Sequence, residues 1–248
     1  MGMDSLQKLR EINLRTTKEL IKQSITPDVL VIQAAASFET VQNSSNVLEE
    51  KLRAWYALYN PEFSHVVIDN KEFVSKIVTN RRKGLLESIG KKEKESMGGE
   101  LKEKDIEIIQ RLAHAVMVVF EQMKMQEAYL EELVKEVCPN VQWIAGTVIA
   151  TKLLSFAGSL KRLAEMPSST IQLLGAEKAL FRHIKQGAKS PKFGVLHNHV
   201  LVQNAKKDLK GKIARVLADK LSIAAKVDFF KGKFIGDTLL KKIEEKFR

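Results

Sequence analysis

The stretch DIEIIQRLAHAVMVVFEQMKMQEAYLEELVKEV, residues 105–137, decides the fold of this chain. Its apolar side chains recur at alternating steps of three and four residues, with one glutamate among them: Ile106, Ile109, Ala113, Val116, Phe120, Met123, Glu127, Leu130, Val134 and Val137. A seven-residue repeat of this kind places apolar side chains along one stripe of a long helix and is typical of coiled coils. At about 1.5 Å per residue, the helix should be roughly 50 Å long.

A second helix is needed to cover that stripe, and residues 28–59 are the candidate. Thr26-Pro27-Asp28 signals its start, and Asn60-Pro61 ends it because proline lacks an amide donor and restricts the residue before it. The apolar and aromatic side chains of this segment keep helical spacing: Val41, Leu48, Leu52, Trp55 and Tyr59. We therefore predict a long antiparallel coiled-coil hairpin, with the polar stretch GKKEKESMGG, residues 90–99, as its exposed tip.

The repeat does not fix whether the seam closes within one chain or between two. If it closes between two chains, Val116, Phe120 and Met123 are the predicted dimer contacts. Asp69-Asn70 should cap a further helix that runs through Phe73 and Leu85.

The composition changes at Cys138-Pro139-Asn140, which ends the long helix. We predict a coiled-coil domain with an N-terminal linker helix over residues 1–140 and a globular helical domain over residues 141–248. The second domain should contain a helix over 141–165, another over 208–227 and a last one capped by Asp237. Strand signals are almost absent because Val and Ile rarely alternate at a spacing of two, so the predicted fold class is all-α.

Positive charge gathers in the C-terminal part of the chain. Residues 1–145 hold 20 Lys and Arg against 22 Asp and Glu, whereas residues 146–248 hold 21 against 8, a net charge of +13. A basic module beside a neutral one is the pattern of a nucleic-acid-binding protein. Binding to a membrane surface is disfavoured, because Trp55 and Trp143 lie outside the basic part of the chain. A membrane-spanning helix is disfavoured as well, because no apolar stretch is long and uninterrupted enough to cross a bilayer.

The single cysteine, Cys138, excludes an intrachain disulfide and a metal site built from cysteines. It fits a reducing compartment, and we expect a cytoplasmic location.

The segment LLGAEKALFRHIKQGAKSPKFG, residues 173–194, carries the clearest basic face. Lys178, Arg182, Lys185 and Lys189 follow one another at steps of four, three and four residues. Further bases occur nearby: Lys192, Lys206, Lys207, Lys210, Lys212 and Arg215. Such runs are often plain solvated faces, but solubility favours mixed signs, so bases without interleaved acids favour phosphate binding.

Two interpretations of Gly175-Ala176-Glu177-Lys178 remain open from local rules. Glu177 can be a carboxylate at a helix start, where negative charge is favourable. Alternatively, the exposed amides of the helix start and Lys178 can receive a backbone phosphate. The stretch lacks the glycine spacing of a nucleotide-binding loop.

His197-Asn198-His199 has no third ligand nearby, so we predict no metal site and instead expect Asn198 and His199 to contact RNA. No nucleophile with a partnered base can be assigned, and the acids of the basic part are sparse. We therefore predict no enzymatic activity and no cofactor.

The segments GAEKALFRHIKQGAKSPKFGVL (175–196) and GKIARVLADKLSIAAKVDFFKG (211–232) together resemble the Nop-domain family. LVIQA (30–34), KLRAWYALYNPEF (51–63) and SLKRLAEMPSSTIQLLGAEK (159–178) extend the resemblance over nearly the whole chain. Its best fit is to the archaeal scaffold of box C/D ribonucleoproteins, the particles of RNA-guided 2′-O-methylation.

The resemblance implies a non-enzymatic scaffold with a self-associating coiled coil and a globular Nop domain. That domain would bind a kink-turn of the box C/D guide RNA together with its small ribosomal-protein-like partner. Gly175, Ala176, Glu177, Lys178 and Arg182 match the family element that approaches the RNA. The family recruits the methyltransferase fibrillarin through a domain before the coiled coil, and this chain is expected to lack it.

Two other functions remain as alternatives. The chain could be a coiled-coil interaction protein whose basic domain docks an acidic protein, or a Nop-domain factor of the splicing type. A nuclease or RNA-modifying enzyme is disfavoured because no nucleophile can be named.

Overall fold

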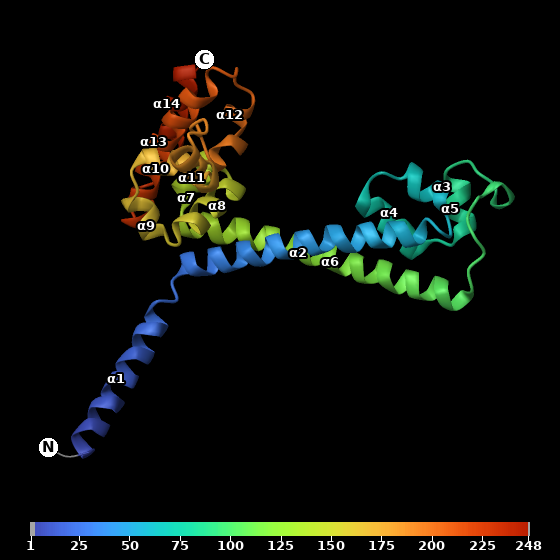
Figure 1. The fold of residues 1–248 in the computed structure, drawn as a ribbon, viewed down its shortest axis with the longest axis horizontal. Coiled ribbons are helices and arrows are strands. Elements are labelled where there is room, and N and C mark those ends of the chain that lie inside the picture. The colour runs from blue at the N-terminus through green and yellow to red at the C-terminus, as the bar shows by residue number, and fades with distance from the viewer. Residues whose placement is uncertain (1–2, 248) are drawn as a thin grey trace. The chain divides into compact units, whose positions relative to one another are not determined.

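The computed structural model describes residues 3–247, with the side chains of residues 6–247. Within this range the chain forms fourteen α-helices, two 3₁₀ helices and no strand (Figure 1), which confirms the predicted all-α class. None of these helices combines the length and the apolar character that crossing a membrane requires.

The chain divides into two compact units. Unit 2 is Ala36–Tyr129, and unit 1 combines the chain up to Ala35 with the chain from Leu130 onward. Two long helices, α2 (Pro27–Tyr56) and α6 (Glu103–Val137), contribute to both units. The predicted boundary at residue 140 coincides with neither limit, because the last turns of α6 pack into the core of unit 1. As a division by function, the split into 1–140 and 141–248 stays a prediction.

The helix α1 (Met3–Gln23) precedes α2, and its described side chains, from Leu6 onward, are exposed.

The two long helices run antiparallel. In unit 1, Val31 of α2 lies in the same buried cluster as Val134 of α6. In unit 2, the Gln126 amide donates to the Ser37 hydroxyl over 3.3 Å, while Leu52 shares a buried cluster with Ala113. Residue numbers on α6 therefore fall as those on α2 rise. The antiparallel coiled-coil hairpin predicted from the seven-residue repeat, with its left-handed supercoil, stays a prediction.

Three short helices complete unit 2: α3 (Pro61–Val66), α4 (Asn70–Thr79) and α5 (Arg82–Ser88). The predicted Asp69 cap forms, because its carboxylate accepts from the Glu72 amide over 2.7 Å. The helix predicted to continue from there through Leu85 does not, since the backbone becomes extended at Asn80 and Arg81 and separates α4 from α5.

The polar stretch at residues 90–99 contains the 3₁₀ helix η1 (Glu93–Glu95) and is tied to the unit near its end. The buried Arg82 guanidinium donates to the Ser96 hydroxyl over 2.9 Å and to the Gly98 carbonyl over 3.0 Å. Ser96 in turn donates to the Glu62 carboxylate over 2.8 Å. A buried acid and base are thus bridged by one serine, and the stretch, which is mostly exposed as predicted, is anchored near its end.

In unit 1, residues 139–165 form three helices where the sequence predicted one. They are α7 (Pro139–Ala145), α8 (Thr147–Ala157) and α9 (Leu160–Glu165). Gly146 and Gly158 separate them with φ angles of +76° and +83°, which lie in a region that glycine occupies without steric cost.

The helix α13 (Lys210–Phe229) is the centre of unit 1. It packs against α7, α9, α10 (Ser168–Leu173), α12 (Val200–Gln203) and α14 (Gly236–Phe247). Its buried face is made of small and branched side chains: Ile213, Ala214, Leu217, Ala218, Leu221, Ala224 and Ala225. Two more helices, α11 (Glu177–Gln186) and the 3₁₀ helix η2 (Val195–Asn198), complete the unit.

A buried carboxylate joins α13 to α7. Asp228 accepts from the backbone amides of Asn140 and Val141 over 3.1 and 2.9 Å and from the Asn140 side chain over 2.6 Å. It caps the start of α7 from a position 88 residues away. Burial raises the pKa of Asp228 above its ordinary value, although these three donors favour the ionised form.

Candidate nucleic-acid interface

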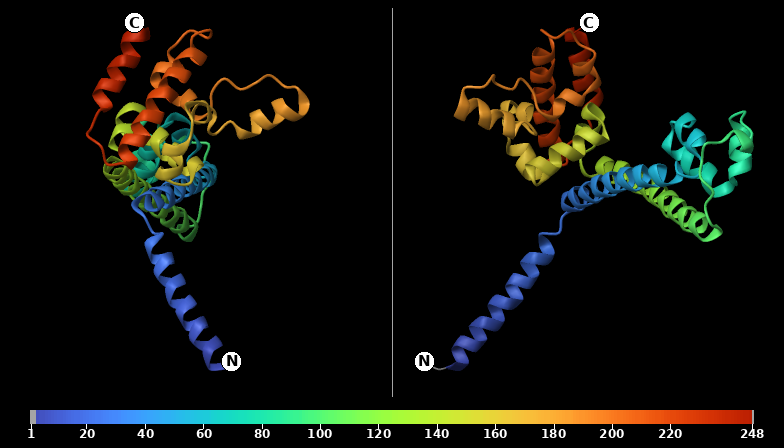
Figure 2. Two further views of the ribbon diagram at one scale, coloured as in Figure 1. Left: turned by 90° about the vertical axis from the view of Figure 1, so that its left-hand side faces the viewer. Right: turned by 45° about the vertical axis from the view of Figure 1, so that its right-hand side comes forward.

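Residues 175–194 form a projecting segment that we name the α11 arm. Figure 2 shows α11 and the loop after it standing out from the neighbouring helices of unit 1. Two backbone hydrogen bonds of 2.8 Å close its base, from Gly194 N to Gln172 O and from Val195 N to Leu174 O. The two ends of the arm are therefore hydrogen-bonded to each other, and the residues between them project from unit 1.

Glycines make this closure possible. A Cβ on Gly194 would lie 1.8 Å from the Leu174 carbonyl oxygen, so only glycine allows the two backbones to approach. Gly175 has a φ of +84°, and a Cβ there would lie 2.6 Å from the Val195 side chain. Gly175, which the sequence assigned to RNA contact, thus has a structural task at the base of the arm.

Glu177 marks the start of α11. Its carboxylate accepts from the Gly175 amide over 2.7 Å, and the N-cap residue, Ala176, supplies no side-chain cap of its own. The first of the two interpretations, a carboxylate at the helix start, therefore describes Glu177. Its negative charge occupies the end of the helix at which a phosphate would otherwise be favoured.

The basic stripe of α11 is exposed as predicted. Lys178, Arg182 and Lys185 lie on α11, whereas Lys189 follows the end of the helix at Gln186 and lies in the loop of the arm. All four are exposed, and none of them pairs with an acid in the described part of the chain. The Arg182 side chain makes a 3.4 Å contact with the Lys178 carbonyl, one turn earlier in the helix.

Apolar side chains of α11 are uncovered as well. The helix buries no side chain, and Phe181 and Ile184 are 60% and 71% exposed. Exposed large apolar side chains beside unopposed bases provide a surface for a partner that is both apolar and anionic.

The stripe continues into a groove of about 860 Å³. Lys189 and Lys192 of the arm line it from one side, and Lys212 and Arg215 of α13 line it from another. The fold thus brings together two pairs of predicted bases that are well separated in the sequence.

Two further charged residues line this groove. Lys246 of α14 adds a base that the sequence analysis did not single out, because nothing local connects it with the arm. Asp208 is the one acidic side chain among the described residues that line the groove. Basic side chains therefore outnumber acidic ones among the described residues that line the groove.

Three further predicted contacts also lie outside the groove. Asn198 is exposed on η2, whereas Lys210 is half-buried and donates to the Gln203 carbonyl over 3.0 Å. Ala176 is half-buried at the start of α11.

The prediction that His199 contacts RNA is wrong. His199 is 9% exposed, its Nε2 lies 2.9 Å from the Ile144 carbonyl, and its Nδ1 accepts from the Leu201 amide over 3.3 Å. Because a carbonyl only accepts, Nε2 carries the proton and the ring is neutral. Burial lowers its pKa, partly opposed by the bond to Ile144. Both ring nitrogens are occupied inside the protein, so His199 caps α12.

The exposed histidine of this stretch is His197. Its ring stacks on Phe193, with centroids 5.0 Å apart and planes 5° from parallel. Phe193 precedes η2 and His197 lies within it, so no helical period in the sequence signals this stack. No group of three or more His, Cys, Asp or Glu side chains suited to a metal occurs among the described residues.

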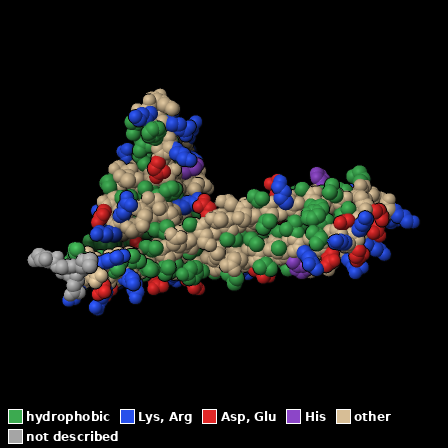
Figure 3. All heavy atoms as spheres, turned by 60° about the horizontal axis from the view of Figure 1, so that its bottom comes forward, with side chains coloured by type: hydrophobic (Ala, Val, Ile, Leu, Met, Phe, Trp, Pro, Cys, Tyr) green, Lys and Arg blue, Asp and Glu red, His purple; other side chains and the backbone are tan. Residues whose placement is uncertain are grey.

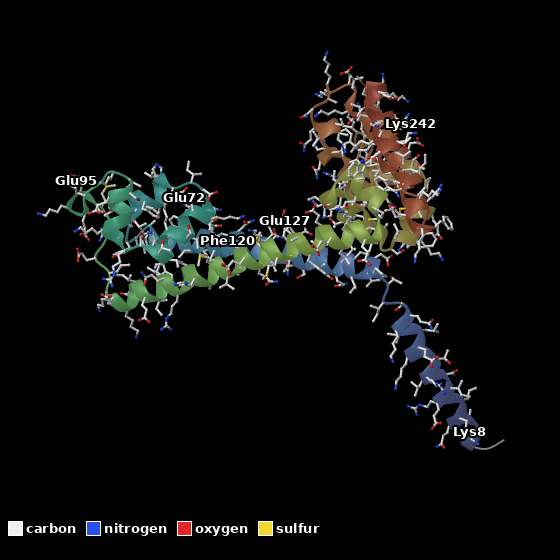
Figure 4. The ribbon with its side chains drawn as sticks, turned by 180° about the vertical axis from the view of Figure 1, so that it is seen from behind. Lys8, Glu72, Glu95, Phe120, Glu127 and Lys242 are labelled. Carbon is white, nitrogen blue, oxygen red and sulfur yellow. The ribbon has the colours of Figure 1, made fainter. Side chains whose placement is uncertain are left out.

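The predicted dimer contacts differ in burial. Val116 is fully buried in the core of unit 2, while Phe120 and Met123 are half-buried on α6. Figure 4 labels Phe120 and, further along α6, Glu127, which interrupts the apolar stripe. Val116 is thus enclosed by its own chain, and Phe120 and Met123 keep part of their surface free.

Comparisons with known proteins agree with this architecture. Residues 37–248 match the model of a family described as Nop, snoRNA binding domain, fibrillarin. A chain called an uncharacterized NOP5 family protein of Methanocaldococcus jannaschii is 38% identical over 97% of this chain and 61% of its own length. Nucleolar protein 56 of Schizosaccharomyces pombe is 32% identical over 88% of this chain and 48% of its own length. This chain therefore spans roughly half to three fifths of these relatives.

A solved structure has the same fold. In the crystal structure of a fibrillarin/Nop5p complex, one chain superposes with a TM-score of 0.59 and 24% identity, covering 100% of this chain and 79% of that one.

Proposed function

The chain belongs to the Nop family, and from that premise we propose that it is a non-catalytic scaffold of a box C/D ribonucleoprotein. In this proposal it binds a kink-turn of the guide RNA together with a ribosomal-protein-like partner, so that fibrillarin can 2′-O-methylate a target RNA. Fibrillarin would be a partner in this assembly, and we place the particle in the cytoplasm.

One observation carries the proposal: the unopposed basic stripe of the α11 arm runs into a basic groove. Lys and Arg side chains that meet no acid are available to neutralise phosphates, and this neutralisation supplies much of the affinity of proteins for nucleic acids. The exposed Phe181 and Ile184 on the same helix offer apolar contact to a protein that is already seated on the RNA. Because the arm carries both basic and apolar exposed side chains, it can contact the phosphates of an RNA and the apolar surface of a protein bound to that RNA.

The experiment is a binding measurement with a kink-turn RNA, free and loaded with its partner protein. We expect tight binding only to the loaded RNA. The double variant Lys178→Glu, Arg182→Glu should weaken it by about 1–3 kcal/mol, as expected for charged contacts. Lys18→Glu, Lys22→Glu on α1 is the matched control, with the same spacing on another exposed helix, and should bind as the wild type does.

Three outcomes would contradict the proposal. Equal affinity for naked duplex DNA would make the binding purely electrostatic. Binding of the partner protein without RNA, at full strength, would favour docking of an acidic protein. Turnover of the RNA by the purified chain would make it an enzyme.

We also propose self-association through α6. Apolar side chains remain exposed on this helix, with Val118 and Met125 at 62% and 61%, and Figure 3 shows hydrophobic side chains on the molecular surface. They lie on roughly the opposite side of α6 from the half-buried pair Phe120 and Met123, because two residues turn an α-helix by about 200°. Native mass spectrometry should report a dimer for the wild type and a monomer for Val118→Glu, Met125→Glu. A monomeric wild type at micromolar concentration would contradict this proposal.

A further inference from the structure

The turn between α13 and α14 exposes aromatic side chains that no part of the proposed interface uses. We name Trp143 together with residues 230–234 the aromatic turn. Trp143 is 55% exposed, Phe230 76% and Phe234 49%. The rings of Trp143 and Phe234 meet edge to face, with centroids 5.7 Å apart and planes 87° from parallel. Three large aromatic side chains thus present surface to solvent within one region of unit 1.

These rings are held in place. The Ile235 amide donates to the Asn140 side chain over 2.7 Å, and Asn140 also donates to the buried Asp228. A Cβ on Gly236 would lie 2.8 Å from Phe234 and 3.0 Å from Trp143, so the backbone fits closely beneath both rings. The exposure of the rings therefore follows from a fixed turn.

Lysines flank Phe230 and Phe234 in the sequence. Lys226, Lys231 and Lys233 are exposed, and the acid within the same stretch, Asp228, is buried and accepts three hydrogen bonds from Asn140 and Val141. The next acid along the chain is Asp237, in the first turn of α14. The turn itself therefore presents a net positive charge.

Lys231 occupies an unusual backbone position. Its φ of +53° makes it the one non-glycine residue with a positive φ in the described part of the chain. Helices commonly end on glycine at this position, because a side chain there costs free energy. A lysine held there in spite of that cost is an observation independent of the exposed rings.

We propose that the aromatic turn is a second RNA-binding surface, which takes single-stranded nucleotides. Bases would stack on the open faces of Trp143, Phe230 and Phe234, while Lys231 and Lys233 contact phosphates. A nucleotide combines a flat apolar face with an anion close by, which matches exposed rings flanked by lysines. This inference rests on the proposed function in its choice of RNA as the ligand, but on residues separate from the α11 arm.

The test uses the fluorescence of Trp143 in the full chain. Trp55 is the second tryptophan and lies in unit 2, so the variant Trp55→Phe leaves Trp143 as the reporter. We expect a twelve-nucleotide oligouridylate to quench Trp143 at low salt. Phe230→Ala, which removes a ring with little buried surface, should raise the dissociation constant about tenfold.

Lys231→Gly separates function from folding. The substitution removes the base and relieves the positive φ, so we expect weaker binding of the oligouridylate with an unchanged or higher melting temperature. Lys161→Gln on α9 removes an exposed lysine outside the aromatic turn and should leave the binding unchanged.

Three results would overturn the inference: no quenching of Trp143, equal quenching by a polyglutamate peptide, which would indicate docking of an acidic protein, or wild-type affinity in both Phe230→Ala and Lys231→Gly. Two sets of variants distinguish a failure of this inference from a failure of the proposed function. Lys178→Glu, Arg182→Glu should leave oligouridylate quenching intact, and Phe230→Ala should leave binding to the loaded kink-turn intact.

Discussion

At the scale of single residues, His199 shows how a polar side chain in a basic sequence becomes part of the core. Its ring joins the start of α12 to α7 through the Ile144 carbonyl, and burial keeps it neutral. The partner lies 55 positions away in the sequence. No local pattern could reveal this bond, so the RNA contact predicted for His199 failed, whereas the exposure of Asn198 agrees with its predicted role.

His199 should make stability depend on pH. Its pKa in the folded chain lies below the ordinary 6.5, because burial disfavours the charged ring. Between the lowered pKa and 6.5 the unfolded chain binds more protons, so the free energy of unfolding falls as the pH drops through this range. Urea unfolding at pH values of about 7.5 and 5.5 should show this fall in the wild type.

Two variants isolate the effect. His199→Asn keeps an acceptor for the Leu201 amide but cannot titrate, so part of the pH dependence should vanish, and about 1–2 kcal/mol should be lost near neutral pH with the Ile144 bond. His197→Asn, at the exposed neighbour, should keep the wild-type dependence. If the unfolding free energies of the wild type and of both variants depended on pH in the same way, His199 would not be the source of the pH dependence.

Gly194 should be the most sensitive glycine of the α11 arm. In Gly194→Ala the new methyl group meets the Leu174 carbonyl oxygen, which belongs to the backbone and cannot move aside, so we expect a loss of about 2–3 kcal/mol in unfolding free energy. Gly187→Ala is the control: its φ is +64° but no atom lies within 4 Å, so it should cost about 1 kcal/mol. Chemical denaturation measures both, and equal losses would contradict the steric account.

At the scale of elements, the sequence predicted helices best where a period runs uninterrupted. The stripe of residues 105–137 became α6, and residues 28–59 became α2, because a repeat sustained over many turns leaves few alternatives. Residues 141–165 were predicted as one helix and form three, since Gly146 and Gly158 adopt positive φ angles. A glycine inside a helical pattern does not reveal its φ; packing decides it.

Some features of the candidate interface could likewise be predicted from the sequence, and others could not. The bases Lys178, Arg182 and Lys185 of α11 could be predicted from spacing, because they follow one another at helical steps, whereas Lys189 follows the end of the helix. The groove could not, since Lys192 and Arg215 come together only through the packing of unit 1. The stack of His197 on Phe193 likewise depends on a short turn that no periodicity signals.

The helix α11 should be less protected from hydrogen exchange than α13. It buries no side chain, so its amides open without disturbing the core, whereas those of α13 require the core to open. Hydrogen exchange followed by mass spectrometry should show fast exchange in residues 177–186 and slow exchange in residues 213–225. Adding the loaded kink-turn RNA should slow exchange in α11, and unchanged rates there would argue against the arm as the binding element.

At the scale of the whole molecule, the location of the charge determines how binding responds to salt. Eight bases belong to the arm and groove: Lys178, Arg182, Lys185, Lys189, Lys192, Lys212, Arg215 and Lys246. If most of them neutralise phosphates, affinity for the loaded RNA should fall by about 10³ between roughly 50 and 200 mM salt.

Lys189→Gln should reduce the slope of that salt dependence by about one phosphate contact. Lys22→Gln on α1 changes the net charge equally and should leave the slope unchanged. Titrations by fluorescence anisotropy at several salt concentrations measure both, and equal slopes for Lys189→Gln and the wild type would remove Lys189 from the interface.

The insertion of unit 2 between two segments of unit 1 also has a consequence for synthesis. The ribosome delivers Ala36–Tyr129 as one uninterrupted stretch, so unit 2 has all its residues before α13 has been made. Unit 1 must wait, because Val31 finds its core neighbours only after Leu133 and the helices beyond it have emerged. Domains generally fold as units in order of emergence. The first segment of unit 1 therefore stays without its core partners until the helices after Leu130 have emerged.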